Sequence, residues 1–232
     1  MPTLIAAALA FAALHLLVSG TGLRGVLVAR LGAGPYRGLF SLATVGTLVF
    51  VRRSYSHAFA TDNQYYWVLP YAQHMAAPIM LVAVFFAVAG LSTPSPTAVG
   101  QEKLLAQGAQ PRGIQHVTRH PFLWGVALWA TFHLAANGDA ASLVLFATFL
   151  IVALLGTRSI DRKRERALGD AWRSYAARTS NLPFLALAQG RTQLAWREIG
   201  WWRPLLALVV FGALVSLHPL LFHAYPMPGM ND

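Results

Sequence analysis

Histidines recur inside the apolar stretches of this 232-residue sequence, where an ionisable side chain is costly and therefore a candidate for function. Residues 119–139, RHPFLWGVALWATFHLAANGD, carry His120 at one end and His133 near the other. His15 lies within the first apolar stretch, and His74 is near the start of the third. A helix rises about 1.5 Å per residue, so His120 and His133 would lie about 20 Å apart and belong to different sites.

Neutral imidazole is a natural ligand of haem iron, and two facing helices can supply an axial pair. Zinc needs three or four ligands close together. His74, His133 and His218 could provide them only where their three helices converge. A single buried histidine could instead hydrogen-bond to a neighbouring helix, but several on different spans favour a shared ligand site. The sequence has no cysteine, so disulfides and thiolate ligands are excluded.

Three further polar residues flank the apolar part of the segment 119–139. Arg119 and His120 come just before it, where they could anchor a helix at the membrane boundary or take part in chemistry. Pro121 suits the first turn of a helix, because its missing N–H costs nothing there. Asn137 follows His133 by one helical turn and is a candidate to act beside it.

The composition predicts an integral membrane protein. Hydrophobic residues make up 56% of the chain and charged residues only 11%, whereas soluble domains carry about 25% charged residues. The net charge of +10 does not indicate a nucleic-acid partner, because the basic residues fall in loops between apolar runs. The expected partner is therefore the lipid bilayer.

Six apolar segments predict an all-α polytopic bundle of about six transmembrane helices, in a single domain over residues 1–232. They cover residues 2–19, 38–51, 72–91, 121–136, 141–157 and 203–222. The short NGDAA connection makes the fourth and fifth helices antiparallel neighbours. Residues 160–178 alternate apolar and arginine positions at helical spacing, which predicts an amphipathic helix on the cytoplasmic surface.

The basic residues also predict the orientation. Sixteen of the eighteen Lys and Arg residues fall in three connections, at 20–37, 92–120 and 158–203, which share one side if six helices cross. The positive-inside rule places that side in the cytoplasm. Both termini would then be periplasmic, in the inner (cytoplasmic) membrane of a bacterium.

Four segments in order resemble the NnrU family of bacterial membrane proteins. They are HLLVSGTGLRGVLVARLGAGPYRGLFSL, YAQHMAAPIM, RHPFLWGVALWATFHLAANGDAASLVLF and DRKR. The resemblance implies a link to nitric oxide and nitrite metabolism in denitrification. That family is similar in turn to the plant zeta-carotene isomerases, which implies haem b and cis–trans isomerisation of a carotenoid-like polyene. The isomerases' two axial histidines match His15 and His133, and Ala130 stands where they have a cysteine. A pair of His74 and His133 is an alternative set of haem ligands.

A second resemblance points to another class of enzyme. RHPFLWG followed by ERALGDAWRSYAARTSNLPF resembles the isoprenylcysteine and phospholipid methyltransferases, which bind S-adenosylmethionine. It implies a cytoplasmic cofactor pocket near His120 and Glu165. The further counterparts are Arg119, Trp172, Tyr175 and Pro183. Phe122 and Trp124 depart from the tyrosine that is usual in that motif. A non-enzymatic assembly factor for a respiratory complex is a further alternative, so the sequence alone does not determine whether the protein is an enzyme.

Overall fold

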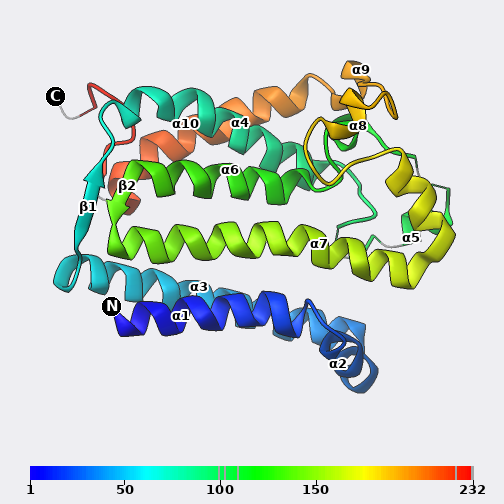
Figure 1. Ribbon diagram of the computed structural model, residues 1–232, viewed down its shortest axis with the longest axis horizontal. Helices are drawn as coiled ribbons and strands as arrows, with labels where there is room; N and C mark the ends of the chain where they lie inside the picture. The colour runs from blue at the N-terminus through cyan, green and yellow to red at the C-terminus, as the bar shows by residue number, and fades with distance from the viewer. Residues whose placement is uncertain (99, 102, 109, 223, 231–232) are drawn as a thin grey trace. The chain divides into compact units, whose positions relative to one another are not determined.

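The structure is a computed structural model that describes residues 1–98, 100–101, 103–108, 110–222 and 224–230 (Figure 1). The helices and strands follow in this order: α1 Pro2–Ala13, the π-helical turn η1 Leu14–Val18, α2 Leu23–Leu31, α3 Ala33–Thr61, β1 Tyr65–Val68, α4 Ala72–Ser92, α5 Lys103–Ala106, the 3₁₀ turn η2 Gly113–His116, α6 Pro121–Ala136, β2 Asn137–Asp139, α7 Ala140–Ala177, α8 Leu185–Ala188, α9 Trp196–Ile199 and α10 Trp202–Phe222.

The chain forms two compact units, each assembled from separate stretches of the sequence. Unit 1 comprises Met1–Pro70 and Ala130–Ser159, and unit 2 comprises Tyr71–Trp129 and Ile160–Asp232. The boundaries fall inside α6 and α7, so neither unit is a continuous segment. The single domain expected over residues 1–232 stays a prediction.

In unit 1, α1 packs along the second half of α3. Leu4 clusters with Ala58, whereas Phe11, two turns later, clusters with Val51. The residue numbers of the contacts decrease along α3 as they increase along α1, so the two helices are antiparallel. The first half of α7 completes this core through Ala141 and the residues that follow it.

A two-stranded antiparallel pair closes one end of unit 1. β2 directly joins α6 to α7, and its Gly138 pairs with Trp67 of β1. A Cβ atom on Gly138 would lie 2.1 Å from the carbonyl oxygen of Trp67, so only glycine fits there. The indole N–H of Trp67 donates to the carbonyl of Ala135, at 3.0 Å. The NGD sequence thus serves as the expected tight connection between two helices.

In unit 2, α4 packs against α10 and against the first half of α6. A Cβ atom on Gly125 of α6 would lie 2.7 Å from the carbonyl oxygen of Ala83 of α4. Small residues let membrane helices approach this closely. Phe86 and Ala89 of α4 pack with Ile114 of η2, the turn that precedes α6.

The expected helical membrane bundle is confirmed, and the strand pair β1–β2 is an addition to it. All six predicted apolar segments fall in helices, and among the described residues α4, α7 and α10 are each long and apolar enough to span a membrane. The pair Pro2–Val18 and Leu23–Leu31, bent by 78°, brings the number of candidate spans to four. α6 is apolar but only 16 residues long, and α3 has 29 residues.

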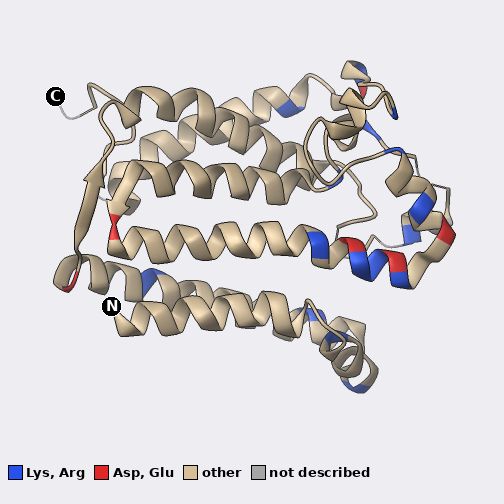
Figure 2. Cartoon of the chain, in the orientation of Figure 1, with Lys and Arg blue, Asp and Glu red and all other residues tan. Residues whose placement is uncertain are grey.

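The segment expected to form a separate amphipathic helix, residues 160–178, instead continues α7. The helix breaks inside this segment at Gly169, where φ is 49° and ψ is −121°. The predicted division into faces holds beyond the break: Trp172 and Tyr175 are buried, whereas Arg173 is exposed. Lys and Arg gather on the second half of α7, as Figure 2 shows.

Candidate functional site

His15 lies in the π-helical turn η1, which interrupts the regular helix of the first apolar segment. Such turns are rare and occur frequently at functional sites. Nδ1 of His15 lies 2.8 Å from the carbonyl oxygen of Phe11. A carbonyl only accepts, so Nδ1 carries the hydrogen and Nε2 of the neutral ring holds the lone pair. Metal-binding histidines are held in this way, with the second nitrogen donating to a backbone carbonyl.

Aromatic rings surround the partly buried imidazole of His15. Its ring centroid lies 4.2 Å from that of Phe11 and 5.5 Å from that of Phe40. Phe40 stacks in turn on Tyr36, at 6.0 Å, and the guanidinium of Arg24 lies over the Tyr36 ring at 5.9 Å. His15 therefore has an apolar, aromatic environment that would suit the face of a porphyrin.

His133 lies in the same unit as His15. Its ring packs against Phe146 of α7 at 4.7 Å, and Phe149, one turn later in α7, packs against Phe11 at 5.0 Å. Phe11 of α1 thus borders His15, and Phe146 of α7 borders His133. The amide of Asn137 donates to the backbone carbonyl of His133 rather than to its ring, at 2.9 Å.

His74 belongs to unit 2 and is exposed at the start of α4, with its ring 5.7 Å from that of Tyr71. His218, near the end of α10 in the same unit, donates from Nδ1 to the carbonyl of Ala224 at 2.8 Å. Another histidine at this end of the sequence, His223, lies outside the described residues. Within the described part of the chain, no group of three or more His, Asp or Glu residues could hold a metal ion.

A buried polar cluster in unit 2 brings Arg119 and His120 together with a partner that the sequence analysis missed. Asp161 of α7 accepts from Arg119 Nε at 2.9 Å and from Arg119 Nη2 at 2.6 Å. It also accepts from Nε2 of His120, at 2.7 Å, and from the amide of Asn181, at 3.1 Å. We call Arg119, His120, Asp161 and Asn181 the Asp161 cluster.

The charges in the Asp161 cluster follow from burial and hydrogen bonding. Burial alone would raise the pKa of Asp161, but the hydrogen bonds from His120 and Arg119 outweigh it and hold the pKa far below its usual range. Burial lowers the pKa of His120, although its hydrogen bond to Asp161 opposes this. The cluster therefore consists of an ionised carboxylate, a guanidinium and a neutral imidazole that donates through Nε2.

The surrounding residues anchor the loop after α7 to the start of α6. The indole of Trp124 donates to the carbonyl of Asn181, at 2.7 Å, and the Thr118 hydroxyl donates to the same carbonyl, at 2.6 Å. The Arg119 guanidinium lies 5.7 Å from the ring of Trp172. Trp172 and Tyr175, the predicted methyltransferase counterparts, are thus buried packing residues beside this cluster, and Glu165 is exposed.

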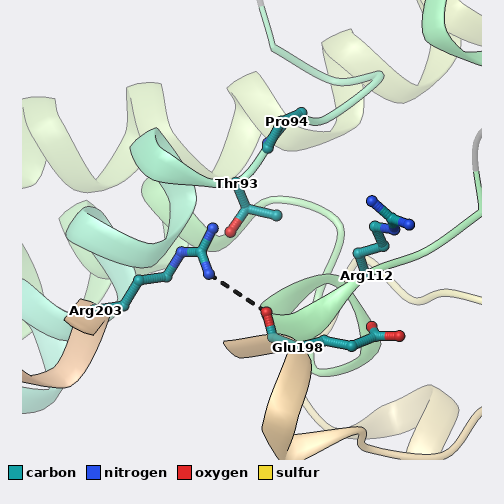
Figure 3. A pocket seen from close by; sticks show the side chains of 5 residues that line it. All are labelled: Thr93, Pro94, Arg112, Glu198 and Arg203. Carbon is teal, nitrogen blue, oxygen red and sulfur yellow. Dashed lines mark hydrogen bonds between the residues drawn. The ribbon is translucent and has the colours of Figure 1, made fainter. Parts of the chain in front are cut away.

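Unit 2 also contains a small cavity of about 210 Å³, which is lined by Thr93, Pro94, Arg112, Glu198 and Arg203 (Figure 3). Arg203 is already engaged, because it donates to the carbonyls of Glu198 and Ser92 and to the Ser92 hydroxyl. Hydrogen bonds from the Gly113 backbone and from His116 lower the pKa of Glu198. The Arg203 contacts tie the start of α10 to the end of α4, and the Glu198 contacts tie α9 to η2.

Together, the apolar helices and the buried ionisable residues define a multi-pass helical membrane protein. The chain belongs to the NnrU family, because the family model described as NnrU protein matches residues 3–226. It is also 30% identical over 82 residues to the chloroplastic 15-cis-zeta-carotene isomerases of Zea mays and Arabidopsis thaliana. Each match covers 35% of this chain and only 22% of the isomerase. No solved structure matches the chain.

Proposed function

We propose that this NnrU-family protein binds haem b through His15 and His133 and isomerises a cis double bond of a carotenoid-like polyene in the membrane. The observation that carries the proposal is the hydrogen bond from His15 Nδ1 to the Phe11 carbonyl, which leaves Nε2 to ligate iron. The similarity to the 15-cis-zeta-carotene isomerases supports the reaction type.

The residues around the two histidines fit the group. Phe11, Phe40 and Phe146 supply apolar walls against the imidazoles, and the chain offers no thiolate that could compete for iron. Bound ferrous haem would add electron density to the polyene and so lower the order of the bond that rotates. The protein's own part is to hold the imidazoles in place and to keep water from the polyene.

An absorption spectrum tests haem binding. The protein would be purified in mild detergent from haem-replete cells and measured oxidised and reduced. We expect a Soret band that is lost in His15→Ala and in His133→Ala but kept in His57→Ala, a control for an exposed histidine of α3. A colourless wild-type protein would overturn the haem proposal, and S-adenosylmethionine binding would then be measured. Loss in His74→Ala or His218→Ala, with His133→Ala unchanged, would assign the second ligand to unit 2.

The reaction needs a second experiment. The chain would be expressed in carotenoid-producing cells that lack their own 15-cis isomerase, and their carotenoids separated by chromatography. Conversion of the accumulated cis isomer is expected, and its loss in His15→Ala would connect the activity to haem. Unchanged accumulation with a haem-loaded protein would reject the polyene as substrate. A shift of the Soret band on addition of nitric oxide would then support a role in nitric-oxide-linked metabolism.

The orientation belongs to the same proposal: both termini face the periplasm of a bacterium, and the basic second half of α7 faces the cytoplasm. The charge distribution supports it, since sixteen of the eighteen Lys and Arg residues fall in connections on one side of a six-span arrangement. Reporter fusions at Met1 and after Met230 test it, because alkaline phosphatase is active only in the periplasm.

A further inference from the structure

Tyr36 carries a buried hydroxyl that has no hydrogen-bond partner. The side chain is in the first turn of α3, is 6% exposed, and its oxygen is fully covered by protein. A buried polar group without a partner is uncommon, because it forfeits its hydrogen bonds to water without replacement. An unsatisfied phenol of this kind has a hydrogen bond to offer to a polar ligand.

The surroundings of Tyr36 indicate what that ligand is. The guanidinium of Arg24, in α2, lies 5.9 Å from the centre of the Tyr36 ring. A ligand bound at Tyr36 would therefore lie near a positive charge. A phenol that donates a hydrogen bond next to a guanidinium selects an anion, and carboxylate is the anion that both groups bind well. The pair lies where α2 begins, directly after the bend that ends the first apolar segment.

The same pair is connected to His15 through one intervening ring. Tyr36 stacks on Phe40, and Phe40 meets His15 edge-on. α2 itself contacts both η1 and α3. A ligand that reaches from His15 to Tyr36 must therefore be flat and apolar at one end and carry a carboxylate at the other. Haem b has this form, since its propionates extend from the rim of the porphyrin.

We propose that Tyr36 and Arg24 bind a propionate carboxylate of haem whose iron is ligated by His15. This inference rests on the proposed haem binding and adds the residues that orient the macrocycle. Tyr36 donates its hydroxyl hydrogen to one carboxylate oxygen, and Arg24 supplies the opposing charge. Because the carboxylate is charged, each contact contributes about tenfold or more to haem affinity.

Titration of the haem-free full-length protein in detergent, followed at the Soret band, measures this. We expect Tyr36→Phe and Arg24→Gln each to weaken haem binding about tenfold or more while the shape and position of the Soret band stay unchanged. Tyr66→Phe and Arg30→Gln are the matched controls, because both side chains are exposed and Arg30 lies on the same helix as Arg24. Neither should alter the affinity.

Haem dimethyl ester, in which the propionates carry no charge, separates recognition from folding. The wild type should bind the ester more weakly than haem, and the Tyr36→Phe, Arg24→Gln double variant should bind both equally. Equal binding of haem and ester by the wild type, or an equal loss of both in the variants, would overturn the inference while leaving haem ligation intact. A wild type that binds neither would instead overturn the proposed function.

Discussion

Asp161 and Arg119 form a bidentate ion pair, with Arg119 Nε 2.9 Å from Oδ1 and Nη2 2.6 Å from Oδ2 of the carboxylate. Both side chains are mostly buried, with exposed fractions of 18% for Asp161 and 13% for Arg119. The pair joins α7 to the residue before His120, across 42 positions of sequence. Arg119, the first residue of RHPFLWG, therefore connects the start of α6 to α7 within unit 2.

Replacement of Asp161 by Asn should destabilise the protein strongly. The substitution leaves the guanidinium of Arg119 buried without a counter-charge, which costs about 3 kcal/mol or more. Thermal unfolding in detergent measures the effect. Asp170→Asn is the control, since the Asp170–Arg173 pair is largely exposed and contributes little. Equal unfolding temperatures for the two variants would show that the Asp161 cluster is not a stabilising element.

The stability should depend on pH through His120. Its pKa is lowered in the folded protein, so the unfolded chain binds more protons and stability decreases as the pH falls below about 6.5, the ordinary histidine value. In His120→Gln this part of the decrease, which begins as the pH falls below about 6.5, should disappear. Chemical unfolding of both proteins at several pH values measures it. Parallel curves for the two would contradict the assignment of a neutral His120.

A further loss of stability is expected in acid. The pKa of Asp161 is held below its usual range, so its contribution is complete above about pH 4 and is lost as the pH falls toward the folded-state pKa. Asp161→Asn should remove this component while retaining the step that belongs to His120. A wild-type stability that stays constant from pH 4 to 2 would contradict the prediction.

Gly125 should not tolerate a methyl group. An added Cβ would lie 2.7 Å from the carbonyl oxygen of Ala83 and 3.0 Å from the backbone nitrogen of Ala87, so α4 and α6 would have to separate. Overpacking of this kind costs about 1–3 kcal/mol. Gly212→Ala on α10 meets no atom within 4 Å and should instead stabilise its helix slightly. Unfolding temperatures of the two variants should therefore shift in opposite directions.

Gly138→Ala should open the pairing of β2 with β1. Its Cβ would meet the backbone oxygen of Trp67 at 2.1 Å, a contact that no side-chain rotation can relieve. Hydrogen–deuterium exchange should increase in residues 64–68, with little change in α4. Gly46→Ala, which meets nothing within 4 Å on α3, is the matched control. Unchanged exchange at residues 64–68 would show that the strand pair does not depend on this approach.

The sequence by itself determined the membrane helices. Every predicted apolar segment falls in a helix, because a run of apolar residues in lipid must satisfy its backbone hydrogen bonds internally. The Asn137-Gly138 connection between two of them was also predictable, since turn residues act locally. The end of the fifth helix was not: it continues through residues 160–168, because nothing in that segment breaks a helix before Gly169.

The tertiary structure alone decided which polar residues meet. Asp161 stands among arginines in DRKR and reads as part of a solvated basic face, yet it is the acceptor for both Arg119 and His120. Likewise, the π-helical turn at His15 and the unpartnered hydroxyl of Tyr36 leave no mark in the residue pattern. Helix formation depends on residues that are neighbours in the sequence, so apolar periodicity predicts it. These contacts depend instead on how helices far apart in the chain pack, and hydrophobicity alone does not specify that packing.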